Sequence, residues 1–198
     1  MSSRWEKQVL ERVIAVLDPD AVGGREIRLA GLDPRVFDSL PDSHAEPTAS
    51  ACREVYDLMR SAAQADRRLA DKTPLVKSWI LTADIYSPKL QRFIEVDETQ
   101  HFSKPRLSRL LVNRAATWAP LYAPRFWDEE YPRLLKKPRR DLDPPHRDEA
   151  RAYRDELRER LPVAYGLRRT IRLDEFTLAI IGLECVADLV LQIIDSEK

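Results

Sequence analysis

The sequence predicts an α/β domain of the α+β layered type, with a central mixed sheet flanked by helices. Apolar residues recur at helical spacing over residues 4–17, beginning at Trp5. Two β-rich runs, Lys77–Tyr86 and Gln91–Asp97, are separated by a short turn that contains Pro88. A proline between two such runs favours a turn, so we expect an antiparallel hairpin.

The elements around this hairpin are expected to be mainly helical. Helical periodicity predicts helices at about 50–70 and 105–116, and a highly charged helix at 148–161 that ends at Pro162. A further strand is expected at 168–173. Asp174 is then an N-cap for a long C-terminal helix that continues to about residue 194.

The length of 198 residues fits one compact unit. Within it we distinguish an N-terminal helix with a wrapping loop, residues 1–49, from the main domain, residues 50–198. The loop is expected from its turn formers, which include the pair Gly23-Gly24.

Charge is balanced over the whole chain but not along it. The formal net charge of zero counts against a protein that coats DNA. Residues 101–140, however, contain ten Lys/Arg and three Asp/Glu, which predicts either a phosphate-facing patch or a solvated basic segment. Aromatic residues lie among these basic ones, and they either stack on bases or pack beneath a loop.

Nothing in the sequence favours contact with a membrane. The N-terminus lacks the pattern of a signal peptide, and Glu184 and Asp188 interrupt the apolar C-terminal segment. We therefore expect a soluble cytoplasmic protein. The apolar surface of the C-terminal helix is broad enough for a homodimer contact.

Three carboxylates are predicted to gather on the hairpin. Glu95 and Asp97 project from the same side of one strand, because strand side chains alternate between faces. Asp84 lies eleven residues before Glu95, so antiparallel pairing brings it to the same face. Crowded carboxylates repel one another unless a cation neutralises them, and oxygen ligands favour Mg²⁺ or Mn²⁺.

The stretch from Asp84 to His101, DIYSPKLQRFIEVDETQH, resembles the core of the PD-(D/E)XK, or restriction-endonuclease-like, nuclease superfamily. It is most similar to the branch near the very-short-patch repair endonucleases. The resemblance implies that Asp84, Glu95 and the backbone carbonyl of Val96 are metal ligands, and that Asp97 occupies the third motif position. It also implies that Gln100 and His101 approach the phosphate or the nucleophilic water.

The resemblance extends to about residue 173, where a glycine turn leads to a strand that bears Arg172. The superfamily's usual lysine is replaced by Asp97, and Lys77 and Lys104 are candidates to supply the missing cation. Glu54 is either an auxiliary acid or a solvated helix residue.

We therefore expect a Mg²⁺- or Mn²⁺-dependent nuclease that hydrolyses phosphodiester bonds, with DNA as the expected partner. In this prediction Asp84, Glu95 and Asp97 hold one or two metal ions. The missing lysine leaves an alternative, a catalytically inactive nuclease-fold module that binds nucleic acid or protein. In a third interpretation the carboxylates are structural and pair with arginines.

Overall fold

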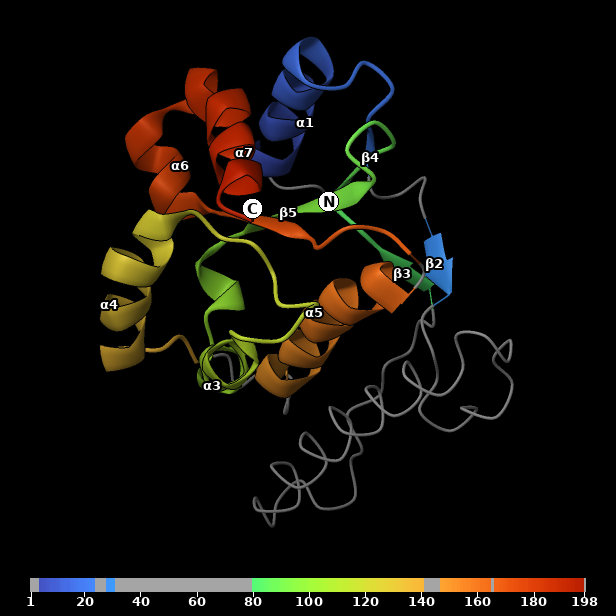
Figure 1. Cartoon of the computed structure of the whole chain (residues 1–198). Helices are drawn as coiled ribbons and strands as arrows, with labels where there is room; N and C mark the ends of the chain where they lie inside the picture. Colours follow the sequence, from blue (N-terminus) through green and yellow to red (C-terminus); the bar gives the residue numbers. More distant parts are fainter. Residues whose placement is uncertain (1–3, 24–27, 31–79, 141–146, 165, 198) are drawn as a thin grey trace.

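The computed structural model describes residues 4–23, 28–30, 80–140, 147–164 and 166–197 (Figure 1). The strands of its main sheet are β1 (Val22–Gly23), β4 (Ile85–Ser87), β5 (Arg92–Asp97) and β6 (Ile171–Asp174), in that spatial order. Neighbours pair antiparallel except β5 and β6, which are parallel. A separate antiparallel pair contains β2 (Arg28–Ala30) and β3 (Ile80–Thr82). The predicted α/β class with a mixed sheet is confirmed.

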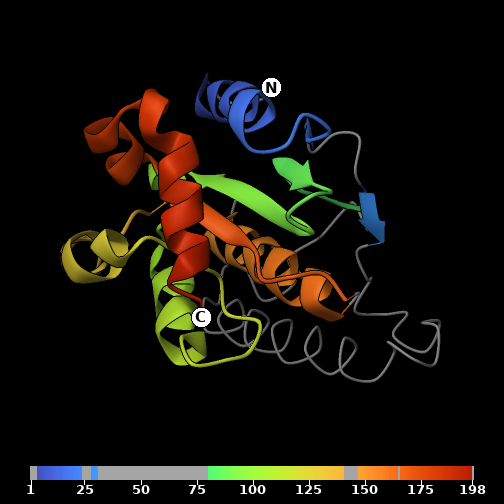
Figure 2. The same cartoon turned by 45° about the horizontal axis from the view of Figure 1, so that its top comes forward.

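Helices surround this sheet. The α-helices are α1 (Arg4–Val16), α3 (Lys104–Asn113), α4 (Tyr131–Lys136), α5 (Arg147–Ala164), α6 (Glu175–Ile181) and α7 (Val186–Asp195). Two 3₁₀ turns, Thr99–His101 and Leu183–Cys185, and a π-helical turn, Phe126–Glu130, complete the described elements. Helices α1 and α7 lie on one side of β5, and α3 and α5 lie on the other (Figures 1 and 2).

The expected hairpin is confirmed, with Ile85 opposite Ile94. Its turn is closed by the amide of Gln91, which donates to the carbonyl of Pro88 at 3.2 Å. The predicted strand 77–86 is wrong in its extent, because β3 and β4 belong to different sheets. At the break, the amide of Asp84 donates to a side chain instead of continuing a strand ladder.

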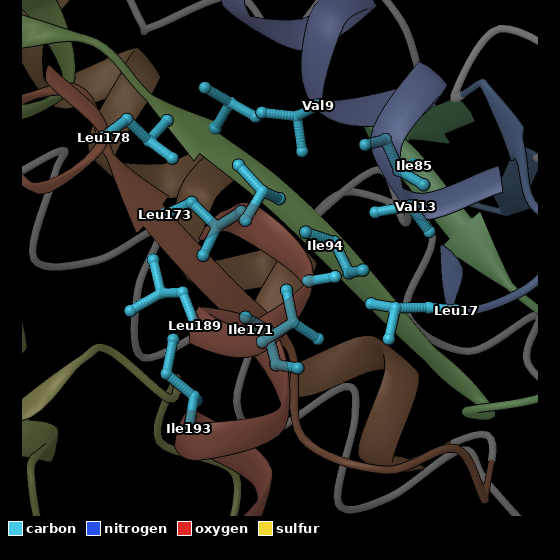
Figure 3. Packing of buried hydrophobic residues seen from close by; sticks show 14 of the residues in the cluster. Val9, Val13, Leu17, Ile85, Ile94, Ile171, Leu173, Leu178, Leu189 and Ile193 are labelled. Carbon is cyan, nitrogen blue, oxygen red and sulfur yellow. The ribbon is translucent and has the colours of Figure 1, made fainter. Parts of the chain in front are cut away.

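The main hydrophobic core fills the side of the sheet that faces α1 and α7 (Figure 3). It joins side chains from the sheet and both helices, among them Val9, Val13, Ile94, Ile171, Leu173, Leu189 and Ile193. Because α1 contributes to this core, the N-terminal helix packs directly on the sheet. The expected boundary between residues 49 and 50, and the helix at 50–70, lie outside the described residues.

A second core lies beneath α3 and α4 and contains the aromatic residues between them. Tyr122, Phe126 and Tyr131 are buried there, and the rings of Tyr122 and Phe126 stack at 3.9 Å. Trp127 is half-buried, with the guanidinium of Arg114 4.5 Å above its ring. Of the two alternatives for these aromatics, packing is therefore the one that the structure adopts.

The predicted single C-terminal helix is wrong. Asp174 caps α6 as expected, accepting from the amide of Thr177 at 2.8 Å. The helix then stops at Gly182, whose φ of 80° is accessible mainly to glycine. The segments before and after it are bent by 103°. No single helix in the described part of the chain is long and apolar enough to cross a membrane.

Helix α5 is longer than expected, because it continues through Pro162 to Ala164. A proline inside a helix leaves the carbonyl four residues earlier without its usual donor. Here that carbonyl belongs to Arg158, and the hydroxyl of Thr170 donates to it at 2.8 Å. The replacement hydrogen bond lets the helix pass Pro162 and ties α5 to the residue before β6.

Candidate functional site

Asp84 and Glu95 are held against each other where β4 meets β5. The amide of Asp84 donates to Oε1 of Glu95 at 3.0 Å, and the amide of Val96 donates to Oδ2 of Asp84 at 2.9 Å. The carboxyl group of Glu95 is thus held by the amide of Asp84, and that of Asp84 by the amide of the residue after Glu95. The sequence-based expectation that these two residues meet is confirmed.

Burial makes both carboxyl groups weak acids. It raises the pKa of Glu95 to about 8, and the nearby charge of Asp84 raises it further in the same direction. Burial also raises the pKa of Asp84 to about 6, although the amide of Val96 opposes the shift. Glu95 is buried, whereas Asp84 is half-buried and is the more accessible of the two.

Asp97 lies on the same face of β5 but has different partners. It accepts a charged hydrogen bond from Arg172 and a hydrogen bond from the hydroxyl of Tyr122. Within the described ranges, no three His, Cys, Asp or Glu side chains form a group that could hold a metal. The structure therefore brings together two of the three expected carboxylates, because Arg172 on the neighbouring strand binds the third.

His101 and Gln100 lie on the 3₁₀ turn that follows β5. Nδ1 of His101 is 2.9 Å from Oδ2 of Asp155 and 3.7 Å from Asp97, and 18% of its side chain is exposed. Burial alone lowers the pKa of His101, but the carboxylates of Asp155 and Asp97 outweigh it and raise the pKa. Gln100 is exposed, and its side chain donates to Glu98 at 3.1 Å.

Behind these residues lies a layer of buried charge between the sheet and helices α3 and α5. We call it the ionic layer, and it comprises the buried residues Glu95, Asp97, Arg106, Asp155, Glu159 and Arg172 together with the half-buried Arg158. Arg172 is at its centre. Its guanidinium binds Asp97, lies 2.7 Å from Glu159 and lies 3.4 Å from Asp155.

The three residues that α5 contributes to this layer, Asp155, Arg158 and Glu159, were not identified from the sequence. A helix with this many charges is expected to be solvated, which hides its buried face. One signal was available, because an arginine inside a buried strand requires buried acidic partners. Arg172 occupies such a strand, and its partners come from α5.

The remaining candidate residues do not join the carboxyl pair. Lys104 begins α3 and is exposed on the surface. Arg172 is fully buried in the ionic layer. Glu54 and Lys77 lie outside the described residues.

Comparisons of the chain with protein-family models, with curated proteins and with solved structures give no match.

Proposed function

We propose that the protein is a divalent-metal-dependent nuclease whose metal ion is held by Asp84, Glu95 and the backbone carbonyl of Val96. The observation that carries this proposal is the interlocked carboxyl pair with raised pKa values. Strongly shifted pKa values at one position are typical of functional sites, and a bound cation would relieve the repulsion that burial intensifies.

The chemistry of the donors fits Mg²⁺ or Mn²⁺, which prefer carboxylate and carbonyl oxygens. Such an ion would lower the pKa of a bound water and stabilise charge on a phosphate. The hairpin followed by a parallel strand supports a restriction-endonuclease-like core. In place of the superfamily's lysine, we propose Arg158, whose Nε lies 3.5 Å from Glu95.

A basic surface beside the start of α3 supports nucleic acid as the partner. Five exposed basic residues, Lys104, Lys136, Lys137, Arg139 and Arg140, make no ion pair with any residue that the structure describes. The amide of Arg139 donates to the carbonyl of Phe102 at 3.1 Å, which places the end of α4 beside the start of α3. Unpaired positive charge of this kind attracts phosphates.

Cleavage assays test the nuclease proposal. Plasmid, single-stranded DNA and RNA are incubated with the full chain and Mg²⁺ or Mn²⁺, and Asp84→Asn is compared with Asp188→Asn. Asp188 is exposed on α7, on the other side of the sheet. We expect metal-dependent cleavage that Asp84→Asn abolishes and Asp188→Asn preserves. Equal cleavage by Asp84→Asn and wild type would exclude this site.

A second candidate function is a nuclease-fold module that binds nucleic acid without cleaving it. The observation that favours it is the state of Asp97, which is bound by Arg172 and Tyr122 at the position where the superfamily has its lysine. In this case the protein shifts the fluorescence anisotropy of labelled DNA or RNA but cleaves neither with Mn²⁺. Lys136→Glu with Lys137→Glu then weakens binding, whereas Asp84→Asn does not.

A further inference from the structure

Helix α5 has a row of arginines along one side. We call this row the arginine stripe, and it comprises Arg147, Arg151, Arg154 and Arg158. Successive members are four, three and four residues apart, so they lie on one line of a helix with about 3.6 residues per turn. The stripe extends over roughly 16 Å of the helix axis. Positive charge therefore follows one side of α5, next to the face that enters the ionic layer.

The C-terminal end of the stripe lies at the candidate site. Nε of Arg158 is 3.5 Å from Oε2 of Glu95. Two turns earlier along α5, Nη1 of Arg151 donates to the carbonyl of Gln100 at 2.7 Å. The stripe thus begins at the carboxyl pair and passes the 3₁₀ turn Thr99–His101. A nucleic-acid strand with its scissile phosphate at Glu95 can therefore place its neighbouring phosphates along these arginines.

Arg154 differs from the other members of the stripe in its surroundings. Its side chain is exposed, and its guanidinium has no ion pair or hydrogen bond with any residue that the structure describes. Partial burial lowers the pKa of Arg154. The like charge of Arg158 lowers it further, as does that of Arg151, and Asp155 acts in the opposite direction. An anion bound at Arg154 would relieve this repulsion between like charges.

We propose that the arginine stripe binds the backbone phosphates that flank the scissile one, with Arg154 as a direct phosphate ligand. This inference deepens the proposed nuclease function and rests on it for the position of the scissile bond. A guanidinium donates two parallel hydrogen bonds to phosphate oxygens, so a row of them holds a strand through its backbone and not through its base sequence. With one phosphate per roughly 3.4 Å of a strand, the stripe is long enough for several.

The dependence of binding on salt tests this inference. Fluorescence anisotropy measures the affinity of the full chain for a labelled DNA duplex and a labelled single strand at several salt concentrations, with EDTA present to prevent cleavage. Arg154→Gln is compared with Arg154→Lys and with Arg12→Gln. Arg12 is exposed on α1, which lies on the opposite side of β5 from α5 (Figures 1 and 2), so its substitution removes the same charge far from the stripe.

We expect Arg154→Gln to reduce the slope of log affinity against log salt by about 0.9 for the duplex or about 0.7 for the single strand, the contribution of one phosphate contact. Its affinity at about 0.1 M salt should fall roughly five- to tenfold. Arg154→Lys should keep the slope, because it keeps the charge, and Arg12→Gln should match wild type. The melting temperature of Arg154→Gln should not fall, since Arg154 has no ionic partner among the described residues.

The outcomes separate this inference from the nuclease function. An unchanged salt slope in Arg154→Gln overturns the inference, even if wild type cleaves DNA or RNA. A loss of affinity accompanied by a lower melting temperature and an unchanged slope would show a structural role and also overturn it. Absence of binding by wild type at low salt overturns it as well. Wild type that binds through Arg154 but cleaves nothing with Mg²⁺ or Mn²⁺ counts against the nuclease function alone.

Discussion

The two faces of the main sheet are both buried, yet opposite kinds of side chain fill them. On β5, Ile94 and Val96 enter the apolar core beneath α1 and α7, whereas Glu95 and Asp97 enter the ionic layer beneath α5. Alternation on β6 gives the same division, since Ile171 faces the apolar side and Arg172 the ionic side. Strands β5 and β6 thus have an apolar core on one face and the ionic layer on the other.

The two faces differ in how much stability a substitution is expected to cost. Apolar contacts are individually small and lose stability gradually as methyl groups are removed. Buried charges depend on their partners, because removing one leaves the others in a low-dielectric surrounding without compensation. The apolar face therefore provides stability, and the ionic face fixes positions, including those of Glu95 and His101.

The largest expected effect comes from Arg172→Ala. It leaves Asp97 and Glu159 without their central cation, and loss of one member of a buried pair typically costs about 3–5 kcal/mol. Urea unfolding at pH 7 measures the change. The free energy of unfolding of Arg172→Lys should lie between those of Arg172→Ala and wild type, because one ammonium cannot replace a guanidinium that binds two carboxylates. Equal stability of Arg172→Ala and wild type would refute the central role of this arginine.

An intermediate effect is expected from Glu95→Gln, and it depends on pH. The pKa of Glu95 is raised from 4.5 to about 8, so the folded protein holds this proton more tightly than the unfolded chain. The stability from this group is present below pH 4.5 and is lost as pH rises to about 8. Glu95→Gln should therefore melt at a higher temperature than wild type at pH 8 without divalent ions.

Glu95→Gln also serves as a control for stabilisation by a metal ion, where wild type should gain more than the variant. Addition of Mn²⁺ at pH 8 should raise the melting temperature of wild type, because a ligand that binds only the folded state stabilises it. Glu95→Gln should gain much less. A difference in melting temperature between the two proteins that stays constant from pH 4.5 to 8 would show that the pKa of Glu95 is not raised.

The smallest effect is expected from Ile171→Val, the neighbour of Arg172 on the apolar face. Removal of one buried methylene group typically costs about 0.5–1.5 kcal/mol. The measurement is again urea unfolding, so the two adjacent positions can be compared directly. A loss for Ile171→Val as large as that for Arg172→Ala would abolish the distinction between the two faces.

Local patterns made the hairpin and the pairing of Asp84 with Glu95 predictable. Pro88 marks the turn, alternation sets the faces, and the partners are eleven residues apart. The pairing of Asp97 with Arg172 could not be predicted from local patterns, because Arg172 is 75 residues away and lies on a parallel strand.

Two other features were missed for different reasons. The charged sequence of α5 is typical of a solvated helix, and only the tertiary arrangement shows that Asp155 and Glu159 face inward. The break in the C-terminal helix did have a local signal, because Gly182 interrupts an otherwise apolar helical pattern. Glycine lowers helix stability, but the left-handed conformation that ends the helix depends on packing.

The central claim, that Asp84 and Glu95 form a cation site at the edge of the ionic layer, is tested most directly by calorimetric titration with Mn²⁺. At pH 8 we expect one ion to bind to wild type and to Asp97→Asn, and none to Asp84→Asn. Affinity for wild type should fall by about tenfold or more at pH 6, because protons compete for these two carboxyl groups. Absence of saturable binding to wild type at pH 8, or undiminished binding to Asp84→Asn, would contradict the claim.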